Sequence, residues 1–324
     1  MTLVDTVNRW TRSSADGVVF QETNERLENL ATVLYSNYEP MTGPFPEYWQ
    51  RLESWIENVP SEDDQKLLFR LAAQLFYVGT KELDNLYRVA FNANVTQWLI
   101  TELGSSLDDP NLETTLGQAL RRTWFCPITD SMRINAFYHL NHISGRNFRP
   151  DWRSLAAFGD NVKLETFLRA NIDRIVLLED FVGSGSQIEP AITFLSTLGH
   201  RPPTLLVPLI ICPAGLTAAE SWKRANPGLT ISPVVRLHPR DFLGPNPVLN
   251  ESDVFPMLRP LIDNTYPQVL NGGDPITTKT YTAYGFRQTG SLVVLATNCP
   301  DNTLPLVHFK SDTWNPLFPR ASRI

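Results

Sequence analysis

Two adjacent acidic residues and the glycine–serine loop behind them form the part of the sequence with the clearest chemistry. Glu179 and Asp180 follow the apolar run Ile175–Leu178, and Gly-Ser-Gly-Ser-Gln occupies 183–187. The apolar run predicts a buried strand, and residues 187–198 predict a helix. The backbone N–H groups and hydroxyls of such a loop can converge on a phosphate, helped by the positive end of the helix. The carboxylates would repel a phosphate, but they can accept hydrogen bonds from a ribose diol or help to hold Mg²⁺.

The elements around this segment predict a parallel sheet. Strand-like runs at 124–128, 174–178, 204–212 and 231–237 alternate with helical patterns at 187–198 and 214–224. This alternation is typical of α/β folds, in which ligands bind at the carboxyl ends of the strands. Beyond them, residues 238–250 and 264–280 predict long loops, and 281–286, 292–297 and 306–309 predict further strands.

The N-terminal third has helical periodicity. In the run 65–78, apolar residues recur at helical spacing, and Ser61 with the acidic residues 62–64 marks a helix start. Further helices are predicted at 22–36, 47–57, 81–103 and 111–122. We therefore expect a helical N-terminal region over residues 1–120 and an α/β domain over residues 121–324.

The charge of the chain argues against one large class of partners. The 324 residues carry 28 basic and 34 acidic side chains, a formal net charge of −6. The charge argues against a protein coated in basic charge for duplex DNA but does not exclude a local patch. Nucleic acid stays a possible partner, although no basic run of five or more residues supports it. The acidic excess lies in the first 110 residues, and the mildly basic remainder suits an anionic small ligand.

Cysteine usage and the hydropathy pattern indicate a cytoplasmic protein. Cys126, Cys212 and Cys299 lie far apart, with neither a disulfide framework nor the spacing of a metal site. The first residues lack the apolar core of a signal peptide, and no run of about 18 apolar residues predicts a membrane-spanning helix. We expect no membrane association.

The segment Glu179–Gly185 resembles the 5-phosphoribosyl-1-pyrophosphate (PRPP) loop of type I phosphoribosyltransferases. The resemblance implies that Glu179 and Asp180 bind the ribose hydroxyls, with Mg²⁺ held near them through the ligand. It implies that the 5′-phosphate lies in a cradle made by Gly183, Ser184, Gly185, Ser186 and Gln187. Gln187 stands where the family usually has Thr. Gly183 stands where some purine enzymes have an acidic residue near the base, which argues against ordinary base salvage.

The same resemblance implies a second loop for the pyrophosphate. The counterpart of that loop in this sequence is the segment of Thr129, Asp130 and Ser131, which follows the apolar run 124–128. The resemblance implies that the backbone amides of this turn and the hydroxyl of Ser131 bind the pyrophosphate oxygens. The alternative is an ordinary helix N-cap by Asp130 or Ser131. The family also covers its substrate with a mobile hood, for which Arg146 and Arg149 are candidates because arginine pairs with two phosphate oxygens at once.

The C-terminal segment is similar to the end of a phosphoribosyltransferase-like subgroup among bacterial conflict and antiviral-defence effectors. The residues concerned are 296–306 and 314–320. The resemblance implies a parallel-sheet type I phosphoribosyltransferase core that uses PRPP, or a related ribose phosphate or nucleotide, with Mg²⁺. The implied activity is phosphoribosyl transfer in an effector. The alternative is a sensor that binds PRPP or a nucleotide without catalysis and contacts a protein partner through its helical N-terminal region.

Overall fold

The computed structural model describes residues 2–12, 16–40, 46–144, 151–158, 160–272 and 281–321. The chain forms two compact units. Unit 1 comprises Met1–Thr80 and Pro239–Ile324, and unit 2 comprises Lys81–His238. Residue 120 lies inside helix α7 (Leu112–Arg121) of unit 2. The unit boundaries therefore differ from the division into 1–120 and 121–324 expected above.

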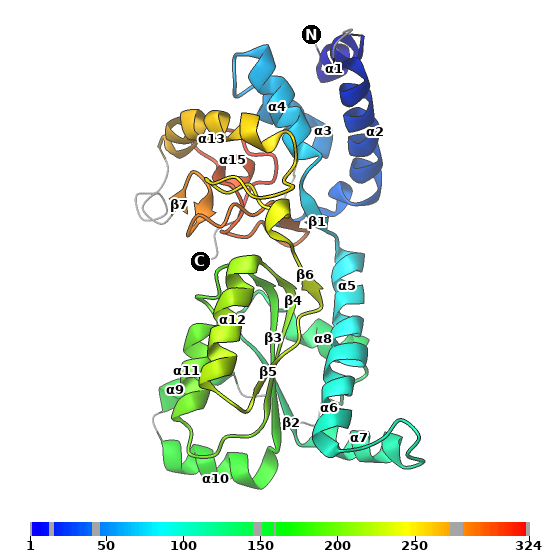
Figure 1. Ribbon diagram of the computed structural model, residues 1–324, viewed down its shortest axis with the longest axis vertical. Coiled ribbons are helices and arrows are strands. Elements are labelled where there is room, and N and C mark those ends of the chain that lie inside the picture. Colours follow the sequence, from blue (N-terminus) through cyan, green and yellow to red (C-terminus); the bar gives the residue numbers. More distant parts are fainter. Residues whose placement is uncertain are drawn as a thin grey trace. The chain divides into compact units, whose positions relative to one another are not determined.

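Unit 2 is built on a parallel sheet of five strands (Figure 1). The strands are β2 (Thr123–Pro127), β3 (Arg174–Val182), β4 (Thr204–Ile211), β5 (Leu229–Ile231) and β6 (Val235–Arg236). Their order is β2-β3-β4-β5, and β6 also pairs with β4. Every pairing within this sheet is parallel, which confirms the predicted α/β fold with a parallel sheet.

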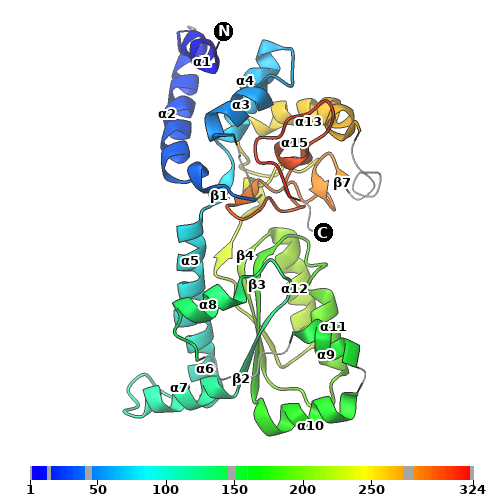
Figure 2. The ribbon, with the colours of Figure 1, turned by 180° about the vertical axis from the view of Figure 1, so that it is seen from behind.

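Helices cover both faces of this sheet. Helices α9 (Trp152–Phe158), α10 (Asn161–Asn171), α11 (Glu189–Thr197) and α12 (Pro213–Ala225) pack on the face that holds Trp124, Ile175 and Leu206. The other face carries Phe125, whose ring contacts Phe137 and Tyr138 of α8 (Ile134–Leu140). In Figure 2, α8 lies on the opposite side of the strands from α9, α11 and α12. Because β3 and β4 are covered on both faces, residues 175–178 of β3 and 205–211 of β4 are continuous apolar runs rather than alternating ones.

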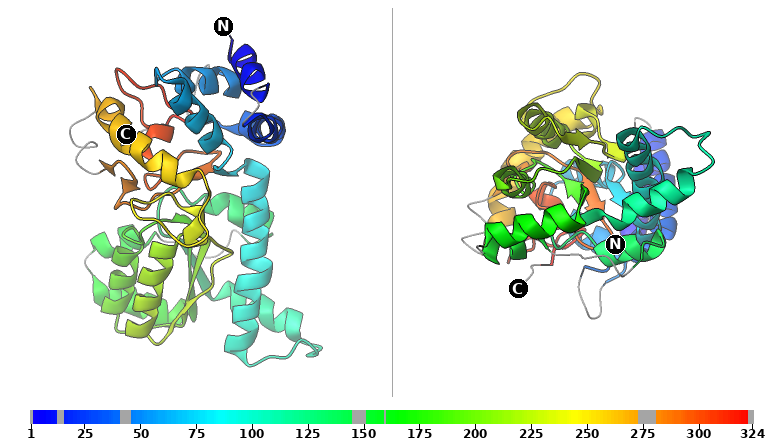
Figure 3. Two further views of the ribbon diagram at one scale, coloured as in Figure 1. Left: turned by 45° about the horizontal axis from the view of Figure 1, so that its top comes forward. Right: turned by 90° about the horizontal axis from the view of Figure 1, so that it is seen from below.

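The predicted helix 81–103 contains a π-helical turn. It consists of α5 (Thr80–Val89), the π-helical segment Ala90–Val95 and α6 (Thr96–Leu103). The left view of Figure 3 shows them as one continuous coil. The Nδ2 of Asn94 in the π turn donates to the carbonyl oxygen (3.0 Å) and the hydroxyl (2.9 Å) of Ser232, just after β5. The turn therefore connects the coil to the segment between β5 and β6, beside the middle of β4.

Unit 1 combines the first helices with the last part of the chain. Its helices are α1 (Leu3–Thr11), α2 (Gly17–Val33), the 3₁₀ turn Tyr35–Asn37, α3 (Tyr48–Ile56), α4 (Glu62–Ala72), the 3₁₀ turn Pro239–Asp241, α13 (Phe255–Leu270) and α15 (Pro305–His308). Strand β1 (Phe76–Val78) pairs in parallel with β9 (Val293–Leu295), and β7 (Tyr281–Thr282) forms a hairpin with β8 (Gly285–Phe286).

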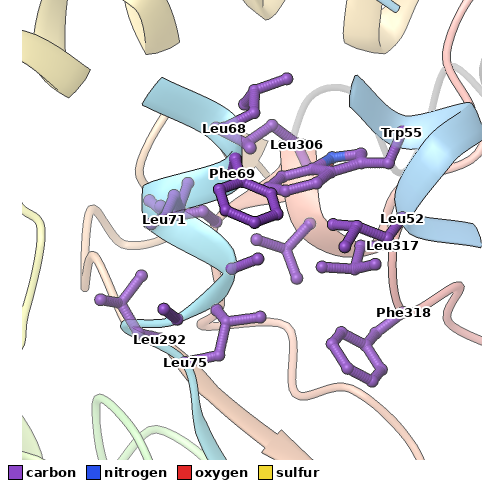
Figure 4. Close-up of a cluster of buried hydrophobic side chains, with 14 of the residues drawn as sticks. Leu52, Trp55, Leu68, Phe69, Leu71, Leu75, Leu292, Leu306, Leu317 and Phe318 are labelled. Atoms are coloured by element: carbon purple, nitrogen blue, oxygen red, sulfur yellow. The ribbon is translucent and has the colours of Figure 1, made fainter. Parts of the chain in front are cut away.

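The core of unit 1 explains why its two chain segments fold together. Leu52, Trp55 and Leu68 from the first segment lie against Leu306 and Phe318 from the last (Figure 4). The indole N–H of Trp55 also donates to the carbonyl oxygen of Leu306 at 2.7 Å. The first eighty residues could not bury these side chains without the C-terminal segment.

Three predictions for unit 1 are corrected by the structure. Helix α4 ends at Ala72, and the last residues of the predicted run 65–78 form strand β1, because Phe76–Val78 finds a partner in β9. Residues 264–270 belong to helix α13 although Pro267 suggested a loop, and 273–280 lie outside the described residues. Residues 306–308 form part of the short helix α15 rather than a strand. Within the described ranges, no helix combines the length and the apolar character that crossing a membrane requires.

Candidate functional site

The two adjacent carboxylates lie near the carboxyl end of β3. Glu179 is 1% exposed and Asp180 is 5% exposed. Successive residues of an extended strand point to opposite faces, and the surroundings of the two acids differ accordingly. The charge of Arg153 in α9 acts on Glu179, whereas the charge of Asp180 acts on Tyr87 in α5. The two acids therefore have different neighbours, although they are adjacent in sequence.

Glu179 joins strand β3 to the loop after β2. Its Oε2 accepts the Thr129 backbone N–H at 2.9 Å, and its Oε1 accepts the Thr129 hydroxyl at 2.6 Å. Burial raises the pKa of Glu179 well above its ordinary value, and the negative charge of Asp180 raises it further, while the bonds from Thr129 oppose the shift. Both carboxylate oxygens thus have a partner within the protein, and the group is pulled toward its neutral form.

Asp180 receives hydrogen bonds from two other groups. The hydroxyl of Ser131 donates to Oδ1 at 2.9 Å, and the Phe181 backbone N–H donates to the same oxygen at 2.8 Å. The hydroxyls of Ser131 and Thr129 are 2.6 Å apart. One hydrogen-bond network therefore connects both carboxylates with Thr129 and Ser131. It joins two segments of the chain that are about 50 residues apart.

The alternative reading of the 129–131 segment as a helix N-cap does not match the structure. The N-cap residue of α8 is Arg133, and its side chain makes no capping hydrogen bond. Ser131 instead bonds to Asp180, and Asp130 is exposed.

The glycine–serine loop presents a run of backbone N–H groups. Among the hydrogen bonds between described residues, none uses an N–H of residues 183–187 as its donor. The hydroxyls of Ser184 and Ser186 are 3.1 Å apart, and Gln187 is exposed. A loop whose amides have no protein acceptor, just before a helix, is suited to binding an anion.

Helix α12 determines the shape of this loop. Gly185 has φ +86°, and a Cβ there would lie 2.9 Å from the ring of Trp222. A Cβ at Gly215 would lie 2.8 Å from the Gly183 carbonyl oxygen. Only glycine at both positions lets the loop and the helix approach so closely.

Two exposed arginines lie near the carboxylates. Arg133 follows the 129–131 segment, and Arg153 stacks on the ring of Trp152 with its guanidinium carbon 5.4 Å from the centroid. Neither guanidinium forms an ion pair within the part of the chain that the structure describes. Both are therefore open to an anionic ligand. Arg146 and Arg149, the candidates for the hood, lie outside the described residues.

Sequence reasoning did not identify Tyr87 as part of this site. Its side chain is 2% exposed, and the charges of Asp180 and Arg133 both act on its phenol. Burial raises its pKa, and the negative charge of Asp180 raises it further. No local pattern marks Tyr87, because it sits in an ordinary amphipathic helix about 90 residues before the acids.

The side chains of this site suit Mg²⁺ only where a bound ligand supplies most of the oxygen donors to the ion. No group of three or more His, Cys, Asp or Glu side chains in the described ranges could hold a metal ion. Asp180 has hard oxygen donors, but Glu179 already uses both of its oxygens on Thr129. Mg²⁺ commonly binds through one or two carboxylates together with substrate phosphates and water, which matches this donor set.

Comparison with known proteins assigns the chain to a family. No curated protein and no solved structure matches it. The model of the PRTase-CE family, whose name denotes a phosphoribosyltransferase, matches residues 52–320. This match spans most of both units and confirms the resemblance to phosphoribosyltransferases that the Glu179–Gly185 segment suggested. The chain therefore belongs to the PRTase-CE family and is a phosphoribosyltransferase-like protein.

Proposed function

We propose that unit 2 binds PRPP, or a related ribose phosphate or nucleotide, at the carboxyl ends of β2 and β3 and transfers its phosphoribosyl group. The observation that carries this proposal is the run of amides at 183–187, three to seven residues beyond Asp180, for which the described residues provide no acceptor. A phosphate needs such donors, and a ribose needs a nearby carboxylate as acceptor.

The geometry suggests different roles for the two acids. Asp180 accepts hydrogen bonds from the ribose hydroxyls directly. Glu179, whose oxygens already accept both bonds from Thr129, positions the 129–131 segment for the pyrophosphate. Ser131 and the amides of that segment then lie beside Asp180, because the Ser131 hydroxyl is bonded to it.

The reaction in this proposal is a displacement at the ribose C1. A nucleophile forms a bond to C1 while the bond from C1 to the pyrophosphate oxygen breaks, and the pyrophosphate leaves with the electron pair. The protein's part is to orient the ribose and to stabilise the departing charge with loop amides and with Arg133 or Arg153. When bound, Mg²⁺ would share the negative charge of the pyrophosphate.

The proposal is tested by the affinity of the protein for PRPP in the presence of Mg²⁺. Asp180→Asn keeps the shape of the side chain but removes its charge and one acceptor. We expect it to weaken PRPP binding at least tenfold in titration calorimetry, about 1.4 kcal/mol. Asp108→Asn makes the same chemical change in an exposed loop of unit 2 and should leave the affinity unchanged. Equal affinities of both variants and the wild type would place the ligand elsewhere.

One observation favours a second candidate function, a PRPP or nucleotide sensor. No acidic side chain occupies the loop position of Gly183, and Glu179 is bonded inward, so a general base beside the ligand is not evident. The sensor would bind the ligand through the same loop and contact a protein partner through its N-terminal helices. Release of pyrophosphate from PRPP, measured with a panel of bases and nucleotides, separates the two functions. Tight binding without release supports the sensor.

We further propose that the protein acts in the cytoplasm as an effector of a bacterial antiviral-defence system. The support is the similarity of segments 296–306 and 314–320 to that subgroup. Cells that express the wild type should survive phage challenge better than cells that express Asp180→Asn at equal protein level. Equal survival across a phage panel would contradict this role.

A further inference from the structure

The peptide that joins Ile128 to Thr129, directly after β2, is hydrogen-bonded on both sides. The carbonyl oxygen of Ile128 accepts the indole N–H of Trp152 at 3.0 Å. The N–H of Thr129 in the same peptide donates to Glu179 Oε2 at 2.9 Å. Because the peptide is trans, its C=O and its N–H point in opposite directions. The two bonds therefore act from opposite sides and fix the rotation of the peptide plane.

The orientation of this peptide determines how the following turn presents its donors. The Thr129 hydroxyl lies 2.6 Å from the hydroxyl of Ser131, which donates to Asp180 Oδ1 at 2.9 Å. Among the hydrogen bonds between described residues, none uses the Ser131 N–H as its donor. A rotation of the preceding peptide would redirect both this N–H and the Ser131 hydroxyl.

Packing fixes the ring of Trp152 independently of its N–H. Trp152 is the first residue of α9, is 7% exposed and belongs to the apolar core of unit 2. Its ring contacts the ring of Phe194 in α11 with centroids 6.1 Å apart, and α9 and α11 lie side by side in Figure 2. The carboxylate of Asp151 accepts the Ser154 N–H at 3.1 Å, which caps the start of α9. The indole therefore connects the turn after β2 to a helix that is itself held in place.

The ring of Trp152 also supports a cation. The guanidinium carbon of Arg153 lies 5.4 Å from the ring centroid, and the Arg153 side chain is exposed. A guanidinium over an indole ring is attracted to its π system. The charge of Arg153 acts on Glu179, which places this cation in the electrostatic range of the carboxylate network. Trp152 therefore contacts both the turn 129–131 and a cation of the site.

We infer that Trp152 is a positioning residue of the ribose-phosphate site, which orients the turn 129–131 and the Arg153 guanidinium for the pyrophosphate end of the ligand. This inference rests on the proposed function for the identity of the ligand, but the two hydrogen bonds on the peptide do not. In the proposed function the 5′-phosphate binds to the glycine–serine loop instead. Loss of the indole N–H should therefore affect one end of the ligand and not the other.

The first test measures the peptide itself, without ligand. The amino acid 3-benzothienylalanine at position 152 replaces the indole N–H by sulfur and keeps the size of the ring. Trp152→Phe removes the N–H together with part of the ring. Trp98→Phe is the matched control, since Trp98 is 6% exposed and its indole N–H has no partner among the described residues.

Hydrogen exchange of the Thr129 N–H, followed by NMR, reports how often this peptide opens. Exchange should become about fivefold faster or more with either change at position 152, because the Ile128 carbonyl loses its donor and the peptide can rotate away from Glu179. In Trp98→Phe it should stay within about twofold of the wild type.

The second test compares two ligands that share the ribose 5-phosphate group. PRPP carries a pyrophosphate at C1, and ribose 5-phosphate lacks it. We expect both changes at position 152 to weaken PRPP binding about fivefold or more in titration calorimetry with Mg²⁺, and to leave the affinity for ribose 5-phosphate within about twofold. A general loss of structure would weaken both ligands alike. Asp180→Asn is the comparison in which both affinities should fall, because both ligands present the ribose hydroxyls.

The outcomes separate this inference from the proposed function. Unchanged exchange of the Thr129 N–H with 3-benzothienylalanine at position 152 would overturn the inference, whatever ligand the protein binds. Affinities for PRPP and ribose 5-phosphate that are both unchanged, or both reduced to the same degree, would also overturn it. If the wild type binds neither ligand, the proposed function fails, and the exchange measurement alone decides whether Trp152 holds the peptide.

Discussion

At the scale of single residues, the two neighbouring acids make different contacts in the structure. Glu179 is bonded through both oxygens to Thr129, whereas Asp180 bonds to Ser131 and lies near the phenol of Tyr87. A buried carboxylate is costly when ionised unless enough donors compensate it. Two hydrogen-bond donors of a single residue, Thr129, compensate the buried carboxylate of Glu179. This contact therefore connects the loop after β2 to strand β3.

The shifted pKa of Glu179 predicts a pH dependence of stability. A carboxyl whose pKa is higher in the folded than in the unfolded chain keeps its proton longer in the folded protein. Its stabilising contribution is therefore full below about pH 4.5, the ordinary value, and is lost as the pH rises toward the folded pKa. Glu179→Gln mimics the neutral form, since its amide can accept the Thr129 N–H and donate to the Thr129 hydroxyl.

We expect Glu179→Gln to flatten this pH dependence. Above about pH 4.5 the free energy of unfolding of the wild type should fall relative to the variant, by up to about 1.4 kcal/mol per pH unit. Denaturant unfolding at a series of pH values measures this difference in the free energy of unfolding. Glu102→Gln, at an exposed position of α6, is the control and should follow the wild type. Parallel curves for Glu179→Gln and the wild type would show that Glu179 is ionised in the folded protein.

At the scale of elements, the close contact between α12 and the glycine–serine loop shapes the candidate phosphate cradle. Gly215 lies against both the Gly183 carbonyl oxygen and the Val182 side chain, each 2.8 Å from the position of a Cβ. A methyl group at this position requires the helix and the loop to move apart. The loop amides would then shift together, because α12 also contacts Gly185 through Trp222.

Gly215→Ala should therefore reduce both stability and ligand binding. Overpacking of this kind costs about 1–3 kcal/mol in the free energy of unfolding, and PRPP affinity should fall with the displaced loop. Gly117→Ala is the matched control, since Gly117 is also helical but a Cβ there meets nothing within 4 Å. It should raise stability by up to about 1 kcal/mol, because alanine replaces glycine in a helix. Normal PRPP binding by a destabilised Gly215→Ala would argue that the cradle lies elsewhere.

At the scale of the whole molecule, the two units differ in sequence continuity and in charge. Unit 2 is one continuous stretch with its own apolar core, whereas unit 1 needs both ends of the chain. Acidic and basic residues are equal in number in unit 2, so the formal net charge of −6 belongs to unit 1. The candidate ribose-phosphate site is therefore in the unit without an acidic excess.

The unit boundaries predict which part of the chain folds by itself. A protein of residues 81–238 should unfold in one cooperative transition and bind PRPP, because its sheet, both helical layers and the loops of the site are present. A protein of residues 121–324 should not fold cooperatively. It lacks the coil of α5 and α6 and also the first segment of the unit 1 core. The two proteins are compared by circular dichroism and thermal unfolding. Cooperative folding of the protein of residues 121–324 would contradict the unit boundaries.

The amino-acid sequence by itself determined the parallel sheet of unit 2 and the family, because both depend on local patterns. Buried parallel strands are continuous apolar runs, and Glu179–Gly185 carries its spacing within seven residues. The sequence also placed residues 129–131 beside the acids, by resemblance. Only the tertiary structure decided how these groups bond to one another, that β1 pairs with β9, and that the charge of Asp180 acts on the buried phenol of Tyr87. Such contacts join residues far apart in the chain and depend on burial and packing, which no local periodicity records.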